Sequence, residues 1–178
     1  ITLNEEANIG ACLASVKWAD EVVVCDSGSQ DRTLEIAAGY GARIFRDEWL
    51  GFAAHKNLAV SRCRQPWVLV LDADERVPLP LREEIEEILR SGAAADGYSV
   101  GRKNFFLGAW IRHGGWYPDR SVRLFRCGRG RFLPRAVHEV AEVTGRIGAL
   151  QHPLAHYTYA SISDFLRRME RYAALAAG

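Results

Sequence analysis

The chain has 178 residues, of which 48% are hydrophobic and 25% charged, and its formal net charge is +1. This length and hydrophobic content suit a single domain with one substantial core. The near-neutral charge excludes a global field that would attract nucleic acid, and no apolar run approaches the roughly 20 residues that a membrane-spanning helix needs. The four cysteines are far apart with no C-x-x-C pair, so we expect free thiols and a cytoplasmic location.

The first half of the chain alternates helical and strand patterns. Apolar residues spaced three and four apart predict a helix after Asn4, at Ile9, Cys12, Leu13 and Val16. Further along, the patterns predict strands at 21–26, 43–45 and 67–71 and helices at 32–39, 51–62 and 81–90. This order predicts an α/β domain with a mostly parallel central sheet and helices on both faces.

The pattern changes after residue 96. Strand-like segments at 97–103, 121–126 and 147–151 alternate with loops rich in glycine and arginine, and an amphipathic helix is predicted at about 161–176. With no internal repeat or linker, we expect 1–178 to be one domain in which residues 96–178 extend the sheet of residues 1–95. The sequence starts on an apparent strand end and stops in a helical pattern, so we expect the complete protein to continue beyond both ends.

Acidic and polar residues cluster where the predicted strands end. The clusters are Thr2–Glu6, Asp26–Asp31 and Asp72–Glu75. Ligands of open parallel sheets bind outside the carboxyl ends of the strands. We therefore expect these three clusters to share one binding site.

The acids at 72 and 74 follow an unbroken apolar run. In extended backbone, residues i and i+2 project from the same face, so Asp72 and Asp74 can converge on one ligand. Two carboxylates suit Mg²⁺ or Mn²⁺, which keep further positions for substrate phosphates. The alternative is that Asp74 only starts a turn before Pro78.

Four motifs together resemble one known family. They are Thr2-Leu3-Asn4-Glu5-Glu6, the segment from Val23 to Thr33, Gly51-Phe52-Ala53-Ala54-His55-Lys56-Asn57, and Leu71-Asp72-Ala73-Asp74-Glu75. Their order and spacing resemble the nucleotide-sugar-binding half of family 2 glycosyltransferases, which have the Rossmann-like GT-A fold. The segments Arg123–Arg126, Val137-His138-Glu139 and His156-Tyr157 are similar to the branch with lipopolysaccharide core β-glucosyltransferases.

The resemblance implies a donor site. Asp72 would face the ribose, Lys56 would lie near the nucleotide, and Asp26 would accept a hydrogen bond from uracil. Thr2, Leu3 and Glu5 would line the other side of the base and ribose. Two alternatives remain open, because Asp26 can instead initiate a turn and Lys56 can be a solvated helix charge.

The resemblance also implies a metal site and a base. Asp74 would reach Mg²⁺ or Mn²⁺, with His156 as a further ligand or, alternatively, as a histidine packed beside tyrosines. Glu139 would be the general base, although His138-Glu139 departs from the Glu-Asp pair common at this position, and His138 would position the acceptor. A surface glutamate is the alternative for Glu139.

The expected acceptor side is basic and aromatic. Arginine side chains suit phosphate or carboxylate, and aromatic faces suit sugar rings. We expect Trp116, Arg120 and Arg123 to bind an anionic glycan or glycolipid there, although solvent-facing strand arginines are the alternative. The final helix suits either the edge of the core or peripheral contact with anionic lipid at the inner membrane face.

The function expected from this resemblance is metal-dependent, inverting transfer of glucose from UDP-glucose to a lipopolysaccharide core or other cell-envelope acceptor. Another donor or a lipid-phosphate acceptor stays open. A sugar-nucleotide pyrophosphorylase would need a glycine-rich loop where this chain has Asn4-Glu5-Glu6. A catalytically inactive sugar-binding module is harder to exclude.

Overall fold

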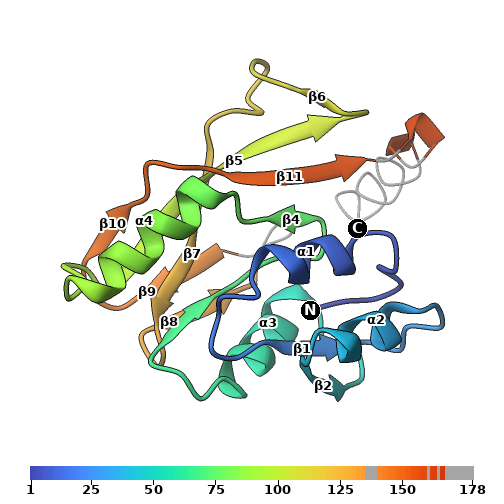
Figure 1. The fold of residues 1–178 in the computed structure, drawn as a ribbon, viewed down its shortest axis with the longest axis horizontal. Coiled ribbons are helices and arrows are strands. Elements are labelled where there is room, and N and C mark those ends of the chain that lie inside the picture. The colour runs from blue at the N-terminus through green and yellow to red at the C-terminus, as the bar shows by residue number, and fades with distance from the viewer. Residues whose placement is uncertain (135–139, 160, 164, 167–178) are drawn as a thin grey trace.

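The computed structural model describes residues 1–134, 140–159, 161–163, 165 and 166 (Figure 1). Its first half alternates helices and strands as predicted. These elements are α1 (Ile9–Ser15), β1 (Val23–Asp26), α2 (Thr33–Gly39), β2 (Arg43–Arg46), α3 (Phe52–Ser61), β3 (Trp67–Leu69), β4 (Glu75–Arg76) and α4 (Leu79–Arg90). Among the residues described, no helix has the length and apolar character needed to cross a membrane.

The second half is built of strands. They are β5 (Gly97–Phe106), β6 (Ala109–Trp110), β7 (Asp119–Arg126), β8 (Gly130–Leu133), β9 (Val140–Val143), β10 (Ile147–Ala149) and β11 (Leu154–Tyr159). The three predicted strands correspond to β5, β7 and β10, whereas β6, β8, β9 and β11 were not predicted. Most of the helix expected at 161–176 lies outside the described residues.

The larger sheet is mixed. Its strand order is β3-β7-β5-β11-β4, with β6 and β10 also paired to β5. Strand β7 is antiparallel to both β3 and β5, while β11 is parallel to β5 and antiparallel to β4. The α/β class is confirmed. The larger sheet is mixed and not mostly parallel as expected, and β1 and β2 form a separate parallel pair. Strand patterns do not specify partners, and β3 takes its described partner from the second half of the chain.

Two apolar clusters fix the helices against these strands. Leu81 and Ile85 of α4 pack with Tyr98 and Val100 of β5, and each of the two α4 side chains is at most 1% exposed. Val60 of α3 packs in a second cluster with strands β3, β7 and β8. Fully burying one such side chain stabilises a fold by roughly 1.5–3 kcal/mol. These contacts hold α3 beside β3, and so set the surroundings of the residues that follow β3.

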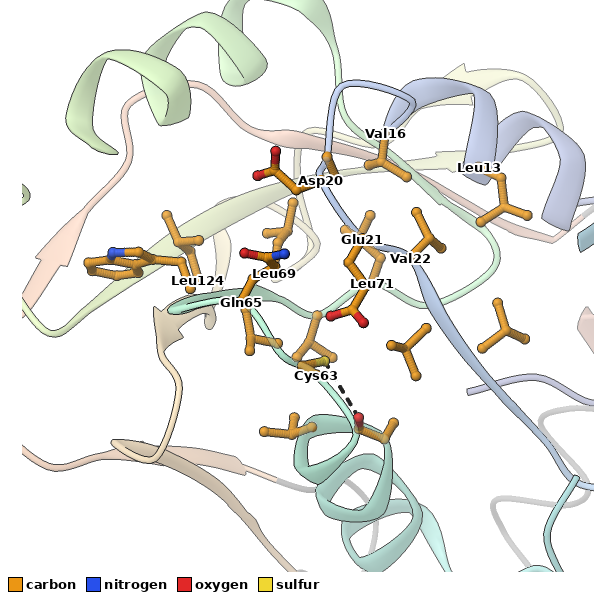
Figure 2. A pocket seen from close by; sticks show the side chains of 18 of the residues that line it. Leu13, Val16, Asp20, Glu21, Val22, Cys63, Gln65, Leu69, Leu71 and Leu124 are labelled. Atoms are coloured by element: carbon orange, nitrogen blue, oxygen red, sulfur yellow. Dashed lines mark hydrogen bonds between the residues drawn. The ribbon is translucent and has the colours of Figure 1, made fainter. Parts of the chain in front are cut away.

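An apolar cavity of about 560 Å³ lies between β1 and β3 (Figure 2). Leu13 of α1 and Val16, which directly follows α1, line it from one side, and Leu69 and Leu71 line it from the other. Most of its wall is hydrocarbon, which offers little to a charged diphosphate. Thr2 and Lys56 also line this cavity. At these two residues the cavity borders the polar residues that follow β3.

Candidate active site

Asp72 is held between two cations just beyond β3. Lys56 Nζ lies 2.8 Å from one carboxylate oxygen, and Arg123 Nη2 lies 3.0 Å from the other. The side chains of Lys56 and Arg123 are only 3% and 6% exposed, so each depends on this pairing to offset its loss of water. The Lys56 ammonium also lies 5.5 Å from the centre of the Phe132 ring. Lys56 is thus a buried paired cation and not the solvated charge considered above.

The charge balance at Asp72 favours the ionised carboxylate. Burial alone would raise its pKa, but the positive charges of Arg123 and Lys56 outweigh burial and hold the pKa of Asp72 well below its usual range. The side chain remains 31% exposed. Asp72 can therefore present a stable negative charge at the surface of this site.

Glu75 holds the backbone of Asp72 in place through a hydrogen bond. It is fully buried, and its carboxylate accepts the backbone N–H of Asp72 at 2.9 Å. Its other oxygen lies 2.7 Å from Arg123 Nη2 and 3.6 Å from Arg102 Nη1. Burial raises the pKa of Glu75 against the opposing charge of Arg123. The residue was part of the quoted motif but had no predicted role, because Arg102 and Arg123 come from distant strands.

Asp74 and His156 face each other. The register of β11 against β4 places His156 opposite Glu75, and Asp74 Oδ2 then lies 3.4 Å from His156 Nε2. Neighbouring ligands of an octahedral ion at about 2.1 Å are separated by about 3 Å, so the spacing suits two adjacent ligands. No group of three or more His, Cys, Asp or Glu side chains suited to a metal occurs in the described part of the chain. Two protein ligands still fit Mg²⁺ or Mn²⁺, whose other positions are taken by water and substrate phosphates.

Asp26 forms the turn that the alternative interpretation predicted. Its Oδ2 accepts the N–H groups of Gly28 and Ser29, each at 2.9 Å, and its Oδ1 accepts the Ser29 hydroxyl. The carboxylate is fully buried. This confirms Asp26 as a turn-initiating residue, and its contact with uracil stays a prediction.

The other predicted donor residues lie beside this turn. Thr2 pairs in parallel with Asp26, and its buried hydroxyl has no hydrogen-bond partner in the structure. The side chain of Glu5 accepts from Asn8 at 3.0 Å, and its N–H donates to Thr33. Leu3 is 51% exposed. Thr2 is therefore paired with Asp26, and it lines the same cavity as Lys56.

The predicted acceptor residues are in different environments. Arg120 is exposed and donates to the carbonyl oxygens of Ser99 and Leu150 at 3.1 and 2.8 Å. Arg123 instead directs its guanidinium at Asp72 and Glu75, so its place in acceptor binding stays a prediction. Trp116 is half-buried in the loop before β7. His138 and Glu139, the predicted base and its neighbour, lie outside the described residues, between β8 and β9.

Two further residues belong to this region but had no predicted role, although His55 is part of a quoted motif. His55 is fully buried, and its Nε2 lies 3.3 Å from the Ser27 hydroxyl. Burial lowers the pKa of His55, which favours the neutral ring. Asn104 of β5 lies next to His156 with its Oδ1 2.6 Å from His156 Nδ1. Nothing in the strand pattern of β5 distinguishes Asn104 from its neighbours.

Comparison with known proteins shows which family the chain belongs to. The model for "Glycosyl transferase family 2" matches residues 1–143. The chain is 34% identical over 99% of its length to the lipopolysaccharide core biosynthesis glycosyltransferase LpsC of Rhizobium meliloti, and covers 68% of that protein. It is 46% identical over 51% of its length to an uncharacterised glycosyltransferase of Rickettsia typhi, of which it covers 32%.

A solved structure shows the same fold. The chain superimposes on residues 1–349 of S. aureus TarS with a TM-score of 0.63 and 18% identity, covering 98% of this chain and 63% of that TarS fragment. TarS has also been crystallised with UDP-GlcNAc. The GT-A fold expected from the sequence is therefore present, and the match over residues 1–143 shows that the chain belongs to glycosyl transferase family 2.

Proposed function

We propose that this domain transfers glucose from UDP-glucose, with inversion, to an anionic lipopolysaccharide core or related cell-envelope acceptor. The observation that carries the proposal is the pair of adjoining groups beyond β3. Asp72 is fixed by Lys56 and Arg123, and Asp74 faces His156 at 3.4 Å. The similarity to LpsC over nearly the whole chain supports the acceptor class.

The donor would lie across the carboxyl ends of β1 and β3. Asp72, with a pKa held low, would accept hydrogen bonds from the ribose hydroxyls. Lys56 would place its ammonium near the diphosphate, and Thr2 would offer the hydroxyl that now has no partner. Leu3, Glu5 and Asp26 would complete the wall around the base, in the places that the family resemblance implies.

Asp74 and His156 would hold Mg²⁺ or Mn²⁺. A divalent ion would neutralise the charge that develops on the departing diphosphate, an effect worth several kcal/mol in general. The 3.4 Å distance between Asp74 Oδ2 and His156 Nε2, set by the register of β4 and β11, supports this assignment. The side chains of Asp74 and His156 are 12% and 13% exposed, so both are mostly buried but keep some access to solvent.

The acceptor would bind next to Trp116 and Arg120. Arg120 is exposed and suited to an anionic group, and Trp116 has an aromatic face suited to a sugar ring. Glu139 would take the proton from the attacking hydroxyl, while His138 positions that hydroxyl. The hairpin of β8 and β9 brackets the segment that contains both residues.

The donor is tested by adding a panel of nucleotide sugars to the full-length protein. We expect UDP-glucose with Mn²⁺ to raise the melting temperature most, and to be hydrolysed slowly to UDP. Adding lipopolysaccharide core oligosaccharide should accelerate UDP release. An inactive binding module would show the thermal shift without UDP release, and a stronger response to another nucleotide sugar would replace UDP-glucose as the donor.

The proposed base is tested by Glu139→Gln, which keeps the shape of the side chain but removes its basicity. A positioned general base contributes about 10²–10⁴-fold, so we expect kcat to fall by this factor while the affinity for UDP is unchanged. His138→Ala serves as the comparison and should lower kcat less. A larger loss for His138→Ala would move the base to His138.

A further inference from the structure

Asn104 connects the predicted metal ligand His156 to the loop that carries Trp116. The parallel register of β5 and β11 places Asn104 beside His156, and Asn104 Oδ1 lies 2.6 Å from His156 Nδ1. On its other side, Asn104 Nδ2 donates to the carbonyl oxygen of Trp116 at 2.6 Å. Asn104 is only 6% exposed, so both contacts are made away from water.

The contact with Trp116 fixes which way the Asn104 amide faces. A backbone carbonyl can only accept a hydrogen bond, so the NH₂ group of Asn104 must point to Trp116. The amide oxygen must then point to His156. Because that oxygen can also only accept, the hydrogen between the two side chains belongs to His156 Nδ1.

A hydrogen on Nδ1 leaves the lone pair of a neutral imidazole on Nε2. Nε2 is the atom that lies 3.4 Å from the Asp74 carboxylate. The Thr158 hydroxyl also lies 3.2 Å from Nδ1, but a hydroxyl can both donate and accept and cannot by itself select the tautomer. Among the contacts of Nδ1 that the structure describes, the Asn104 oxygen, which can only accept, is therefore the group that determines the tautomer of His156.

The other tautomer would block the site. With its hydrogen on Nε2, His156 could donate to Asp74, and this hydrogen bond would occupy both atoms that a metal needs. We propose that Asn104 is a positioning residue that prevents this hydrogen bond, holding His156 in the Nδ1–H form so that its Nε2 lone pair and Asp74 together accept a divalent cation. This inference rests on the metal in the proposed function. Partners that orient metal-binding histidines in this way typically change metal affinity about 10–100-fold.

The tautomer can be measured without metal or activity. In metal-free protein with ¹⁵N-labelled histidine, long-range ¹H–¹⁵N correlation spectra distinguish hydrogen on Nδ1 from hydrogen on Nε2, and the variant His156→Gln identifies the His156 signals among the five histidines. We expect the Nδ1–H form in the wild type at pH 7.5. We expect Asn104→Leu, which has similar volume but no acceptor, to shift His156 to the Nε2–H form.

Two variants separate this role from simple packing. Asn104→Asp keeps an acceptor for Nδ1–H but loses the donor to Trp116, so it should retain the tautomer. Thr158→Val removes the other group near Nδ1 and should also retain it. In titrations of Mn²⁺ followed by electron paramagnetic resonance, with and without UDP, Asn104→Leu should bind about 10–100-fold more weakly, while the other two variants stay within about 3-fold of the wild type.

The results separate failure of this inference from failure of the proposed function. An Nε2–H or doubly protonated His156 in the wild type would overturn the inference, and so would unchanged Mn²⁺ affinity in Asn104→Leu. If the wild type has the Nδ1–H tautomer but does not bind Mn²⁺, the metal in the proposed function is refuted. The tautomer set by Asn104 would then have no role in metal binding. Rescue by Asn104→Asp together with the loss in Asn104→Leu would support the inference.

Discussion

The acidic clusters that follow β1 and β3 are stabilised by different kinds of contact. Asp26 is held by donors that lie within three residues of it in the turn 27–31. Asp72 is held by Lys56 from α3 and by Arg123, which is 51 residues away in β7. The hydrogen bonds of Asp26 can form with its own turn, although Ser29 and Asp31 of the same cluster also accept hydrogen bonds from the distant Asn4 and Glu6. The contacts of Asp72 form only when α3, β3 and β7 have packed together. Loss of a cation that holds Asp72 should therefore affect both the fold and the proposed chemistry.

The largest effect on activity is expected in the cluster Asp72–Glu75, where Asp74 would bind the metal. Asp74→Ala should reduce sugar transfer by about 10³-fold, which corresponds to several kcal/mol, because the charge on the leaving diphosphate would lose its counter-ion. Circular dichroism should show an unchanged fold, and Mn²⁺-dependent binding of UDP should disappear. Glu83→Ala, at an exposed position on α4, is the control. If UDP binds the wild type equally well in the presence of a chelator, the metal assignment is wrong.

A smaller but still large effect is expected at Arg123. Arg123→Met leaves Asp72 and the fully buried Glu75 without this cation, and breaking a buried pair on one side costs about 3–5 kcal/mol of unfolding free energy. Urea denaturation measures this loss. Arg126→Met, on the same strand, breaks a more exposed pair with Asp96 at 3.7 Å and should cost less than about 1 kcal/mol. Equal losses for the two variants would contradict the comparison between buried and exposed pairs.

Kinetics of the same variant, Arg123→Met, show whether Arg123 serves donor binding or acceptor binding. If Arg123 mainly supports Asp72, the change should raise the KM for the donor more than the KM for the acceptor. If Arg123 instead grips an anionic acceptor, the acceptor KM should rise and lose part of its dependence on salt.

Substitution of Asp26, whose contacts are local, should reduce the free energy of unfolding less than substitution of Arg123. Asp26→Asn keeps an acceptor for the turn but removes the charge, so we expect a loss of about 1–2 kcal/mol in unfolding free energy. If Asp26 also accepts from uracil, the affinity for UDP should fall about 10–100-fold, because one hydrogen bond to a charged group contributes about 1.5–3 kcal/mol. UDP affinity equal to that of the wild type, measured by calorimetry, would limit Asp26 to the turn.

The smallest effect at neutral pH is expected at Cys12, whose thiol lies between α1 and the residues that follow β3. The Cys12 thiol lies 3.6 Å from the carbonyl oxygen of Asp72, and burial raises the pKa of Cys12 to about 12. An unfolded thiol ionises near 8.5, so this contribution to stability is complete below about pH 8.5 and is lost as the pH rises towards 12, at about 1.4 kcal/mol per unit. Unfolding free energies of the wild type and Cys12→Ala should therefore converge in this range. Parallel curves for the two proteins would contradict the burial of the thiol.

Local features of the sequence predicted more than long-range features did. The helices and strands of the first half follow from the spacing of apolar residues, and the Asp-Ser-Gly turn at Asp26 follows from turn chemistry. The pairing of β3 with β7 could not be read in this way, because periodicity gives neither the partner nor the direction of a strand. The burial of Lys56 and Arg123, and the contacts of Glu75 and Asn104, depend on that pairing and on β11.

Lys56 also has a consequence for chemical labelling. An amine-reactive reagent needs access to a deprotonated amine, and Lys56 is only 3% exposed with its ammonium directed at Asp72. Lys17 is exposed on the molecular surface and should react first. The rate at which Lys56 becomes acetylated, followed by mass spectrometry, would then report how often α3 separates from the residues after β3. The protein thus contains its own probe for transient opening of the region where we expect the donor to bind.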